Sequence, residues 1–370
     1  MIKLAIIGSR GYPYVYGGFE TFVKELSERL VQQDIEVHVY CQRNLFSERP
    51  DVINGIKLHY IPTLPQKSLN QIIHSFLSIV HATFSKADVL LVVNLAAGPM
   101  GWIPKLTGKK TMINVDGLEW LRPKWQGLGA TYFYWAAKLA TKLYDKIITD
   151  AEAMRSVYLR EFNKDSTVIA YGAPEFQAAK PEGLERLGLT SESYYLIVGR
   201  LIPDNNADLI IRGFLKSSSQ KKLVVVGDVP YSDHYAAELK AMQNERLIFP
   251  GYVKDQKELM AIYQHAFCYI HGHKFGGTNP AMLKAMSNNC SILALDTVFN
   301  REMLNDGEFG IFFQENEDAV AKAVENVEAN PEKIKILKQT VRLGLTDKYN
   351  WDCVTLSYKN QILSLVNSTH

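Results

Sequence analysis

Cysteine is scarce in this chain and widely scattered, which excludes the disulfide-rich class of small secreted proteins. Four cysteines occur among 370 residues, at positions 41, 268, 290 and 353, and no two of them form a CxxC pair. Structural zinc sites usually contain such pairs. We therefore expect neither a zinc site nor a disulfide framework, and we expect a reducing, cytoplasmic setting.

Long apolar runs and a strong charge of one sign are also missing. No stretch reaches the roughly 18 apolar residues that a membrane-spanning helix needs. The opening "MIKLAIIGSRGYP" does not fit a signal peptide, because a glycine turn follows its short apolar run. A formal net charge of +2 gives no case for a nucleic-acid partner. However, residues 1–175 hold 20 lysines and arginines against 16 acidic residues, which predicts a local basic surface in the first half.

The chain does contain a regular alternation of short apolar runs and helical patterns. The apolar runs, which predict strands, are KLAIIG, IEVHVYC, GIKLHYI, DVLLVV, TMINV, KIIT and TVIAY in the first half, and YYLIVG, KLVVVG, RLIFP, FCYIH and SILAL in the second. Amphipathic stretches such as GFETFVKELSERLVQQ lie between most of them. Such an alternation predicts an α/β protein with parallel sheets covered by helices on both faces.

Two doubly wound domains are a better interpretation than one sheet of a dozen strands. Proline, glycine and charged residues cluster at 173–188, as in a linker between domains. We place the first domain at residues 1–174 and the second at residues 175–350. Ligands of doubly wound domains bind at the carboxyl ends of the strands, so the loops that leave the strands are the places to search.

The loop after the first strand, "IGSRGYPYVYGGFETF", does not fit the GxGxxG dinucleotide fingerprint. Gly17 and Gly18 precede a predicted helix, where backbone amides and the helix dipole favour an anion. A plain flexible turn fits equally well. Glu20 in the first helical turn can serve a ligand or simply complement the dipole.

Two further strand ends carry charged candidates. Arg200 follows "YYLIVG", and its guanidinium suits a phosphate group, although a surface pair with Asp204 or Asp208 is the alternative. Asp116 follows "TMINV" in "NVDGLEWLRPKW". Such a carboxylate can contact a hydroxyl-rich ligand, or it can close an Asx-turn.

The segment "HGHKFGGTNPAMLKAM", from His271 to Met286, joins a strand to a helix. Thr278 or Asn279 can cap that helix, and Pro280 suits its first turn. Gly276 and Gly277 permit close backbone approach, so the start of the helix is a second candidate anion site. We expect His271 to pack at the strand end and His273, farther out in the loop, to be the ligand candidate.

Together these motifs resemble the family 4 glycosyltransferases, and more narrowly a bacterial rhamnosyltransferase-like subgroup that acts in surface-polysaccharide assembly. The resembling stretches run through most of the chain in the expected order, and GGFETF and HGHxxGGTNP are specific only in combination. The resemblance implies the GT-B fold, in which two Rossmann-like domains face each other across a cleft. It also implies that a C-terminal helix, here about 351–370, crosses back to the first domain.

The implied reaction is the metal-independent transfer of a sugar from a nucleotide donor, with retention at the anomeric carbon. The absence of a DxD motif agrees with metal independence, and we expect no cofactor. The resemblance suggests dTDP-L-rhamnose as the donor and a saccharide or lipid-linked saccharide as the acceptor.

The resemblance also assigns roles to the candidate residues. The donor diphosphate would be held by Gly17 and Gly18 from the first domain and by Arg200 from the second. The implied catalytic residues are Asp116, Arg200 and His273; the donor-binding residues are Gly17, Gly18, Arg200, Asn205, Gly276, Gly277, Thr278, Asn279 and Lys284; the acceptor-binding residues are Glu20 and Trp120.

Three positions depart from the wider family. Many relatives carry glutamates where this chain has Gly276 and Lys284, and a diphosphate-binding lysine where it has Asn205. The subgroup shares the glycine and the asparagine but not the lysine. Lys284 can reach a phosphate, signal weakened nucleotide binding, or point to solvent. The alternative function is therefore a binding or partner protein that has lost activity; a nicotinamide dehydrogenase ranks lower because GxGxxG is missing.

A basic and aromatic segment, residues 120–146, predicts contact with an anionic membrane surface. Residues 102–146 hold eight lysines and arginines against three acidic residues. We expect Lys138, Lys142 and Lys146 to share one helix face, with aromatic side chains beside them. An ordinary solvated face has the same spacing. The interpretation implies a cytoplasmic protein, peripheral on the inner face of the cell membrane.

Overall fold

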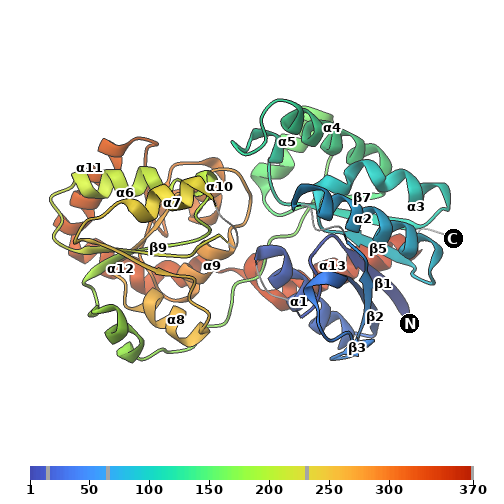
Figure 1. Ribbon diagram of the computed structural model, residues 1–370, viewed down its shortest axis with the longest axis horizontal. Coiled ribbons are helices and arrows are strands. Elements are labelled where there is room, and N and C mark those ends of the chain that lie inside the picture. The colour runs from blue at the N-terminus through green and yellow to red at the C-terminus, as the bar shows by residue number, and fades with distance from the viewer. Residues whose placement is uncertain (14–16, 64–66, 230–232, 368–370) are drawn as a thin grey trace. The chain divides into compact units, whose positions relative to one another are not determined.

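The computed structural model describes residues 1–13, 17–63, 67–229 and 233–367 (Figure 1). The chain divides into two compact units. Unit 1 comprises Met1–Gly172 and Lys348–His370, and unit 2 comprises Ala173–Asp347. The observed division after Gly172 falls at the beginning of the proline- and glycine-rich segment 173–188.

Unit 1 is built on one sheet with strand order β3-β4-β2-β1-β5-β6-β7-β8. All neighbouring strands are parallel except β3 and β4, which are antiparallel. Leu4 of β1, for example, lies beside Val37 of β2 and Val89 of β5. The strands are β1 (Ile2–Ile7), β2 (Ile35–Gln42), β3 (Val52–Ile53), β4 (Ile56–Ile61), β5 (Val89–Val92), β6 (Lys110–Val115), β7 (Lys146–Thr149) and β8 (Thr167–Val168).

Helices cover this sheet because each has an apolar stripe that needs a partner surface. In the first helix the stripe consists of Phe22, Val23, Leu26 and Leu30, all buried. The helices of unit 1 are α1 (Gly18–Val31), α2 (Lys67–Phe84), α3 (Trp102–Leu106), α4 (Leu128–Leu143), α5 (Glu152–Phe162) and α13 (Trp351–Asn367).

The C-terminal helix α13 belongs to unit 1. Its Tyr358 hydroxyl accepts a hydrogen bond of 2.6 Å from Nδ2 of Asn114 on β6. Its Asp352 receives a bond of 3.1 Å from Nε of Arg29 on α1. The last helix therefore packs in the domain in which the chain began, although about 175 residues of unit 2 lie between them in the sequence.

The prediction that Lys138, Lys142 and Lys146 share one face of α4 is partly wrong. The helix ends at Leu143, so Lys146 lies at the start of β7 instead. Its Nζ donates to Oε1 of Gln361 at 2.5 Å and to Oγ of Ser364 at 2.7 Å, both on α13. The periodic spacing of the lysines extended the predicted helix face to Lys146, because the strand KIIT begins with a lysine four residues after Lys142. Lys138 and Lys142 remain on α4.

Unit 2 contains a second sheet, all parallel, with order β11-β10-β9-β12-β13-β14. Its strands are β9 (Tyr194–Val198), β10 (Lys222–Val226), β11 (Leu247–Gly251), β12 (Cys268–His271), β13 (Ile292–Leu295) and β14 (Ile311–Phe313). Its helices are α6 (Ala207–Lys216), α7 (His234–Ala241), α8 (Gln256–Gln264), α9 (Pro280–Ser287), α10 (Val298–Met303), α11 (Glu317–Ala329) and α12 (Pro331–Thr340). The strands β3 and β14, with two and three residues, are too short for periodicity to detect.

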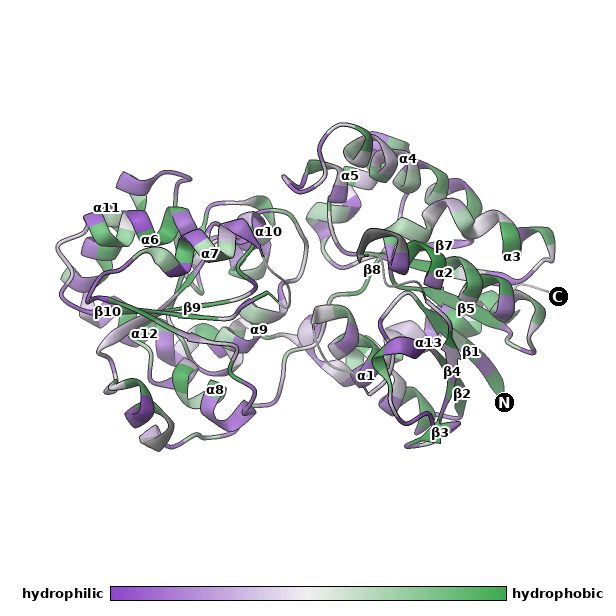
Figure 2. Cartoon of the chain, viewed as in Figure 1, coloured by the Kyte–Doolittle hydropathy of each residue, from purple (hydrophilic) through white to green (hydrophobic). Residues whose placement is uncertain are grey.

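Burial follows the expected pattern of two covered parallel sheets. The strands are green, hence hydrophobic, along most of their length in Figure 2, whereas the helices alternate between green and purple. In unit 2 the β9 and β10 side chains pack with α6 and α11 around Phe214, which is fully buried. Both domains thus have their own hydrophobic core.

No helix in the described part of the chain is long and apolar enough to cross a bilayer.

Candidate functional site

The glycine loop of unit 1 connects β1 to α1. Gly8 and Gly11 have positive φ angles of 112° and 125°, which glycine adopts without strain. Gly17 is the N-cap of α1, and Gly18 is its first residue. Residues 14–16 of the motif lie outside the described residues. The described part places helix-start amides after a strand, as an anion site requires, and the diphosphate role of both glycines stays a prediction.

The side chain of Glu20, in the first turn of α1, is held against the same loop. Its side chain is 3% exposed, and its Oε1 accepts from the backbone N of Arg10 at 3.2 Å and from Nη1 of Arg10 at 3.4 Å. An ion pair with one buried member fixes the path of the loop. This arrangement favours a structural role for Glu20, and its predicted contact with the acceptor stays a prediction. Arg10 is a cation beside the loop that the sequence analysis overlooked.

Asp116 lies directly after β6 and is only partly exposed. Its Oδ2 accepts a hydrogen bond of 3.1 Å from the hydroxyl of Tyr171. Burial raises the pKa of Asp116 to about 6, and Glu119 adds to the rise, while the charge of Arg122 opposes it. A carboxyl group with a pKa near neutrality at a strand end is a candidate for contact with hydroxyl groups.

Trp120 packs inside an aromatic cluster. Its ring lies 6.0 Å from Tyr134, 6.3 Å from Tyr158 and 5.9 Å from Phe162, in each case edge to face. These partners come from α4 and α5, so Trp120 anchors the 3-10 helix η3 (Glu119–Leu121) to both. Its predicted acceptor contact is not tested by this packing.

In unit 2, the loops that leave β9 and β12 are tied together. Nδ1 of His273 and Oδ1 of Asn205 are 2.9 Å apart. Nδ2 of the same asparagine donates to the backbone oxygen of Arg200 at 2.8 Å. Three candidate residues from two loops therefore meet at the carboxyl edge of the second sheet, through a hydrogen-bond chain that the sequence could not reveal.

The guanidinium of Arg200 is exposed. Among the described residues we find no ion pair for it. The predicted alternative partner Asp208 instead contacts the hydroxyl of Tyr235 at 2.7 Å and bonds to Arg212. An arginine at a strand end whose guanidinium faces solvent is available to bind a phosphate group.

The helix α9 begins as predicted. Asn279 is its N-cap, and the side chain accepts from the backbone N of Ala281 at 2.9 Å. Pro280 occupies the first turn, and Gly276, Gly277 and Thr278 are buried just before it. These buried residues lie in the loop that leaves β12, which also contains His273.

His271 and Lys284 occupy different environments. His271 is 4% exposed, its Nδ1 lies 2.9 Å from the hydroxyl of Tyr269, and burial lowers its pKa to about 3. The predicted packing role of His271 is confirmed. Lys284 is partly buried on α9, and burial lowers the pKa of its ammonium group. This is not the environment of a fully solvated helix lysine.

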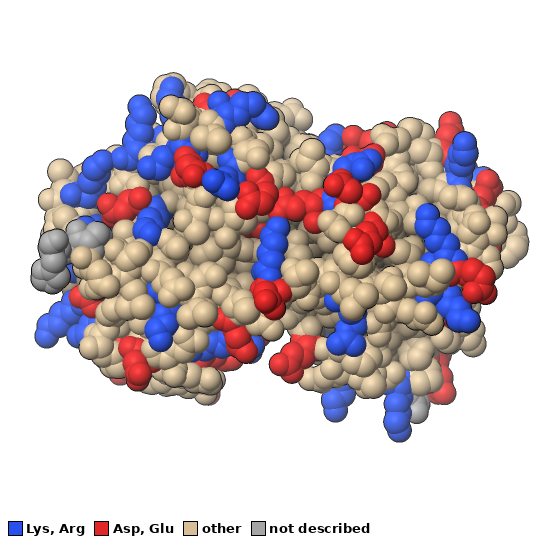
Figure 3. Space-filling view, turned by 180° about the vertical axis from the view of Figure 1, so that it is seen from behind, with Lys and Arg blue, Asp and Glu red and all other residues tan. Residues whose placement is uncertain are grey.

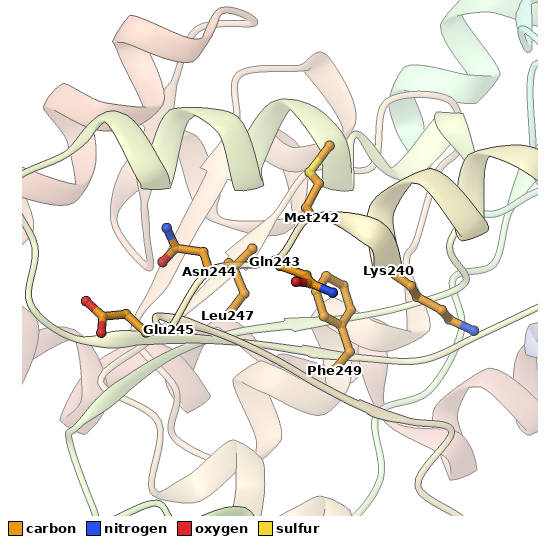
Figure 4. A pocket seen from close by; sticks show the side chains of 7 residues that line it. All are labelled: Lys240, Met242, Gln243, Asn244, Glu245, Leu247 and Phe249. Atoms are coloured by element: carbon orange, nitrogen blue, oxygen red, sulfur yellow. The ribbon is translucent and has the colours of Figure 1, made fainter.

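In the described part of the chain, metal-ligating side chains do not gather at the site. Within the described ranges, no group of three or more His, Cys, Asp or Glu side chains could hold a metal ion. The hollow in Figure 4 lies between α7 and the amino end of β11, and none of the candidate residues lines it. Its lining residues are Lys240, Met242, Gln243, Asn244, Glu245, Leu247 and Phe249.

Two family models match the chain, one for each unit. Residues 1–174 match a domain of unknown function (DUF1972), and residues 182–343 match the glycosyl transferases group 1. Among curated proteins, an uncharacterized glycosyltransferase of Methanocaldococcus jannaschii is 23% identical over 99% of both chains. An N-acetylgalactosaminyltransferase of Campylobacter jejuni that acts on a diphospho-undecaprenol-linked saccharide is 24% identical over 43% of both chains.

Solved structures agree on the architecture. Sucrose-phosphate synthase of Thermosynechococcus elongatus superimposes with a TM-score of 0.82 at 16% identity, covering 100% of both chains. The Anabaena protein HepE, solved with UDP-glucose, superimposes with a TM-score of 0.75 at 14% identity, again over 100% of both chains. At such identities the likeness concerns the fold. The chain therefore has the GT-B fold, and its residues 182–343 match the glycosyl transferases group 1.

Proposed function

We propose that this protein is a retaining, metal-independent glycosyltransferase that moves a sugar from a nucleotide donor to a saccharide or lipid-linked saccharide. The observation that carries the proposal is the carboxyl edge of unit 2, where Arg200, Asn205 and His273 are connected within a glycosyltransferase domain. The start of α9 lies after β12, the strand that also precedes His273. This combination is what a diphosphate needs: a guanidinium, fixed polar groups and backbone amides.

The physical basis is stabilisation of the leaving group. When the glycosidic bond of a nucleotide sugar breaks, negative charge grows on the diphosphate. Fixed donors aimed at that charge lower the barrier, because they need no reorganisation during the reaction. In this proposal Arg200 and the amides of residues 277–279 bind the diphosphate, His273 is oriented by Asn205, and Asp116 of unit 1 contacts the transferred sugar.

For the donor we propose dTDP-L-rhamnose, on the subgroup resemblance alone. HepE, a structural neighbour, was solved with UDP-glucose, so UDP sugars are the second candidate. The lipid-linked acceptor is supported by the Campylobacter relative, whose name specifies a diphospho-undecaprenol saccharide. No metal or other cofactor has a role in this proposal, and chelation with EDTA is expected to leave turnover unchanged.

The test is a panel of dTDP, UDP, GDP and ADP sugars, scored by thermal shift and by slow hydrolysis of the donor. We expect one base class to raise the melting temperature and one sugar of that class to be hydrolysed. Binding without hydrolysis or transfer would support the alternative, a partner protein that has lost activity, to which Lys284 points. A protein that neither binds nor hydrolyses any of them would contradict the proposal.

We also propose that a basic and aromatic surface on unit 1 contacts an anionic membrane. It consists of Trp135, Lys138 and Lys142 on α4 with Trp102 and Lys105 on α3. Nζ of Lys138 lies 4.8 Å above the Trp135 ring, and Nζ of Lys105 donates to the backbone oxygen of Lys142 at 2.8 Å. Blue side chains outnumber red ones at the upper left of Figure 3, in the half of the view that unit 1 occupies. Aromatic rings beside lysines suit the level of lipid headgroups.

A further inference from the structure

The segment after β6 folds around its own arginine. A Cβ placed on Gly117 would lie 2.7 Å from Nη2 of Arg122, so the guanidinium lies against Gly117 and would have to shift if a side chain were added there. Nη1 of Arg122 pairs with Oε1 of Glu119 at 2.8 Å. Oε2 of Glu119 in turn accepts from Nε1 of Trp125 at 2.8 Å. The motif DGLEWLRPKW thus places a partly buried cation against the backbone that directly follows Asp116.

Other titratable groups lie near Asp116 on several elements of unit 1. Tyr171, after β8, donates to Oδ2, and Tyr158 on α5 and Tyr358 on α13 are fully buried nearby. Asp150, at the end of β7, adds a second carboxyl group that interacts with the same tyrosines. Apart from Arg122, these groups are acids or neutral phenols, and burial alone favours a neutral Asp116.

We propose that Arg122 is a positioning residue that keeps Asp116 in its charged form. The ion pair with Glu119 holds the guanidinium in place, and the missing side chain of Gly117 leaves space for it. The inference rests on the proposed function, because it assigns to charged Asp116 the task of accepting hydrogen bonds from sugar hydroxyls. A carboxylate offers only acceptor atoms, whereas the protonated group would also donate. The guanidinium therefore determines which hydrogen bonds the strand end can offer.

The direct experiment is a ¹³C NMR titration of the full-length protein labelled at aspartate Cγ, with Asp116→Asn identifying the resonance. We expect Asp116 to titrate near pH 6 in the wild type and at least one pH unit higher in Arg122→Met. Gly117→Ala should cause a similar rise, because the added methyl group displaces the guanidinium without changing any charge. Arg122→Lys, which keeps the charge, should restore most of the wild-type value.

The kinetic experiment uses the best donor of the panel. If the pKa rises from about 6 to about 7, kcat/KM should fall about fivefold at pH 6 and be almost unchanged at pH 8. Lys124→Met is the control, because Lys124 is an exposed lysine 3.6 Å from Glu119 in the same segment. It should shift neither the resonance nor the profile.

An unchanged Asp116 titration in Arg122→Met would overturn the inference, as would a loss of rate that is equal at all pH values. If Arg122→Met does not fold, the Gly117→Ala titration decides. If the wild type transfers no sugar at all, the proposed function fails, but the NMR titration still shows whether Arg122 sets the charge of Asp116.

Discussion

Arg200 is the single side chain on which the proposed chemistry depends most. It is exposed at the end of β9, and its backbone oxygen is fixed by Asn205. We expect Arg200→Ala to lower kcat at least tenfold, because a lost charge-assisted hydrogen bond costs about 1.5–3 kcal/mol. The melting temperature should hardly change. Arg186→Ala removes another exposed arginine of unit 2, paired with Glu258, and should keep wild-type turnover. Full turnover in Arg200→Ala would remove this residue from the site.

Lys284 tests whether the donor site differs from that of the wider family. Its ammonium group is partly buried, and its pKa is lowered by that burial. We expect Lys284→Glu and Lys284→Met to change the KM for the donor several-fold, measured with dTDP and UDP sugars side by side. Lys257→Glu, an exposed position on α8, is the matched control. Donor kinetics that stay unchanged in both Lys284 variants would make it a structural lysine.

At the scale of elements, α4 joins a buried face to an exposed one. Ala136 and Ala140 are fully buried, whereas Trp135 is 52% exposed and Leu128 is 90% exposed. Exposed apolar side chains that gather beside lysines suit the surface of a membrane. The exposed stripe of α4 is therefore a property of the helix as a whole, because helical spacing aligns positions 128, 135, 138 and 142.

This stripe leads to a membrane-binding prediction. We expect the wild type to sediment with phosphatidylglycerol-containing liposomes at low salt and to be released at high salt, since salt screens the attraction. The double variant Lys138→Glu/Lys142→Glu should lose this binding and keep donor hydrolysis. Lys333→Glu/Lys335→Glu carries the same charge change on exposed positions of α12 and should still sediment. A wild type that stays in the supernatant at low salt would argue for a soluble acceptor.

At the scale of the whole molecule, buried histidines make stability depend on pH. Burial lowers the pKa of His59 and of His74 to about 4 and that of His271 to about 3, below the usual value of about 6.5. The unfolded chain therefore binds more protons than the folded chain at mildly acidic pH. The stability that these groups contribute is complete above about pH 6.5 and is lost as the pH falls toward 4. Asp116, whose pKa is raised, acts in the opposite direction.

We expect the free energy of unfolding, measured with urea, to fall between pH 7 and pH 5. His271→Phe should flatten that dependence for unit 2, and His74→Asn should do so for unit 1. The control is His234→Gln, because the His234 side chain is 88% exposed. A pH dependence that survives unchanged in both buried variants would contradict this account.

The sequence by itself determined the alternation of strands and helices, because apolar periodicity is a local property of the chain. It also located the residues at the strand ends, since parallel strands all end at one edge. The expected strands and the helix start at Asn279 follow from these patterns, whereas the return of the last helix to unit 1 was implied by the family resemblance. Short strands such as β14 and the true end of α4 could not be predicted, because a few residues give no period.

Tertiary structure alone decided the environment of each candidate side chain. Tyr171 contacts Asp116 across 55 positions of the chain, and His273 contacts Asn205 across 68. Burial of Glu20 beside Arg10, of Lys284 on α9 and of the Arg122 guanidinium against Gly117 likewise depends on how distant segments or loop backbones pack. Charge state and hydrogen-bond partners arise from desolvation and proximity, which a linear sequence does not specify. The sequence thus named most of the candidate residues, while the folded chain set their chemistry.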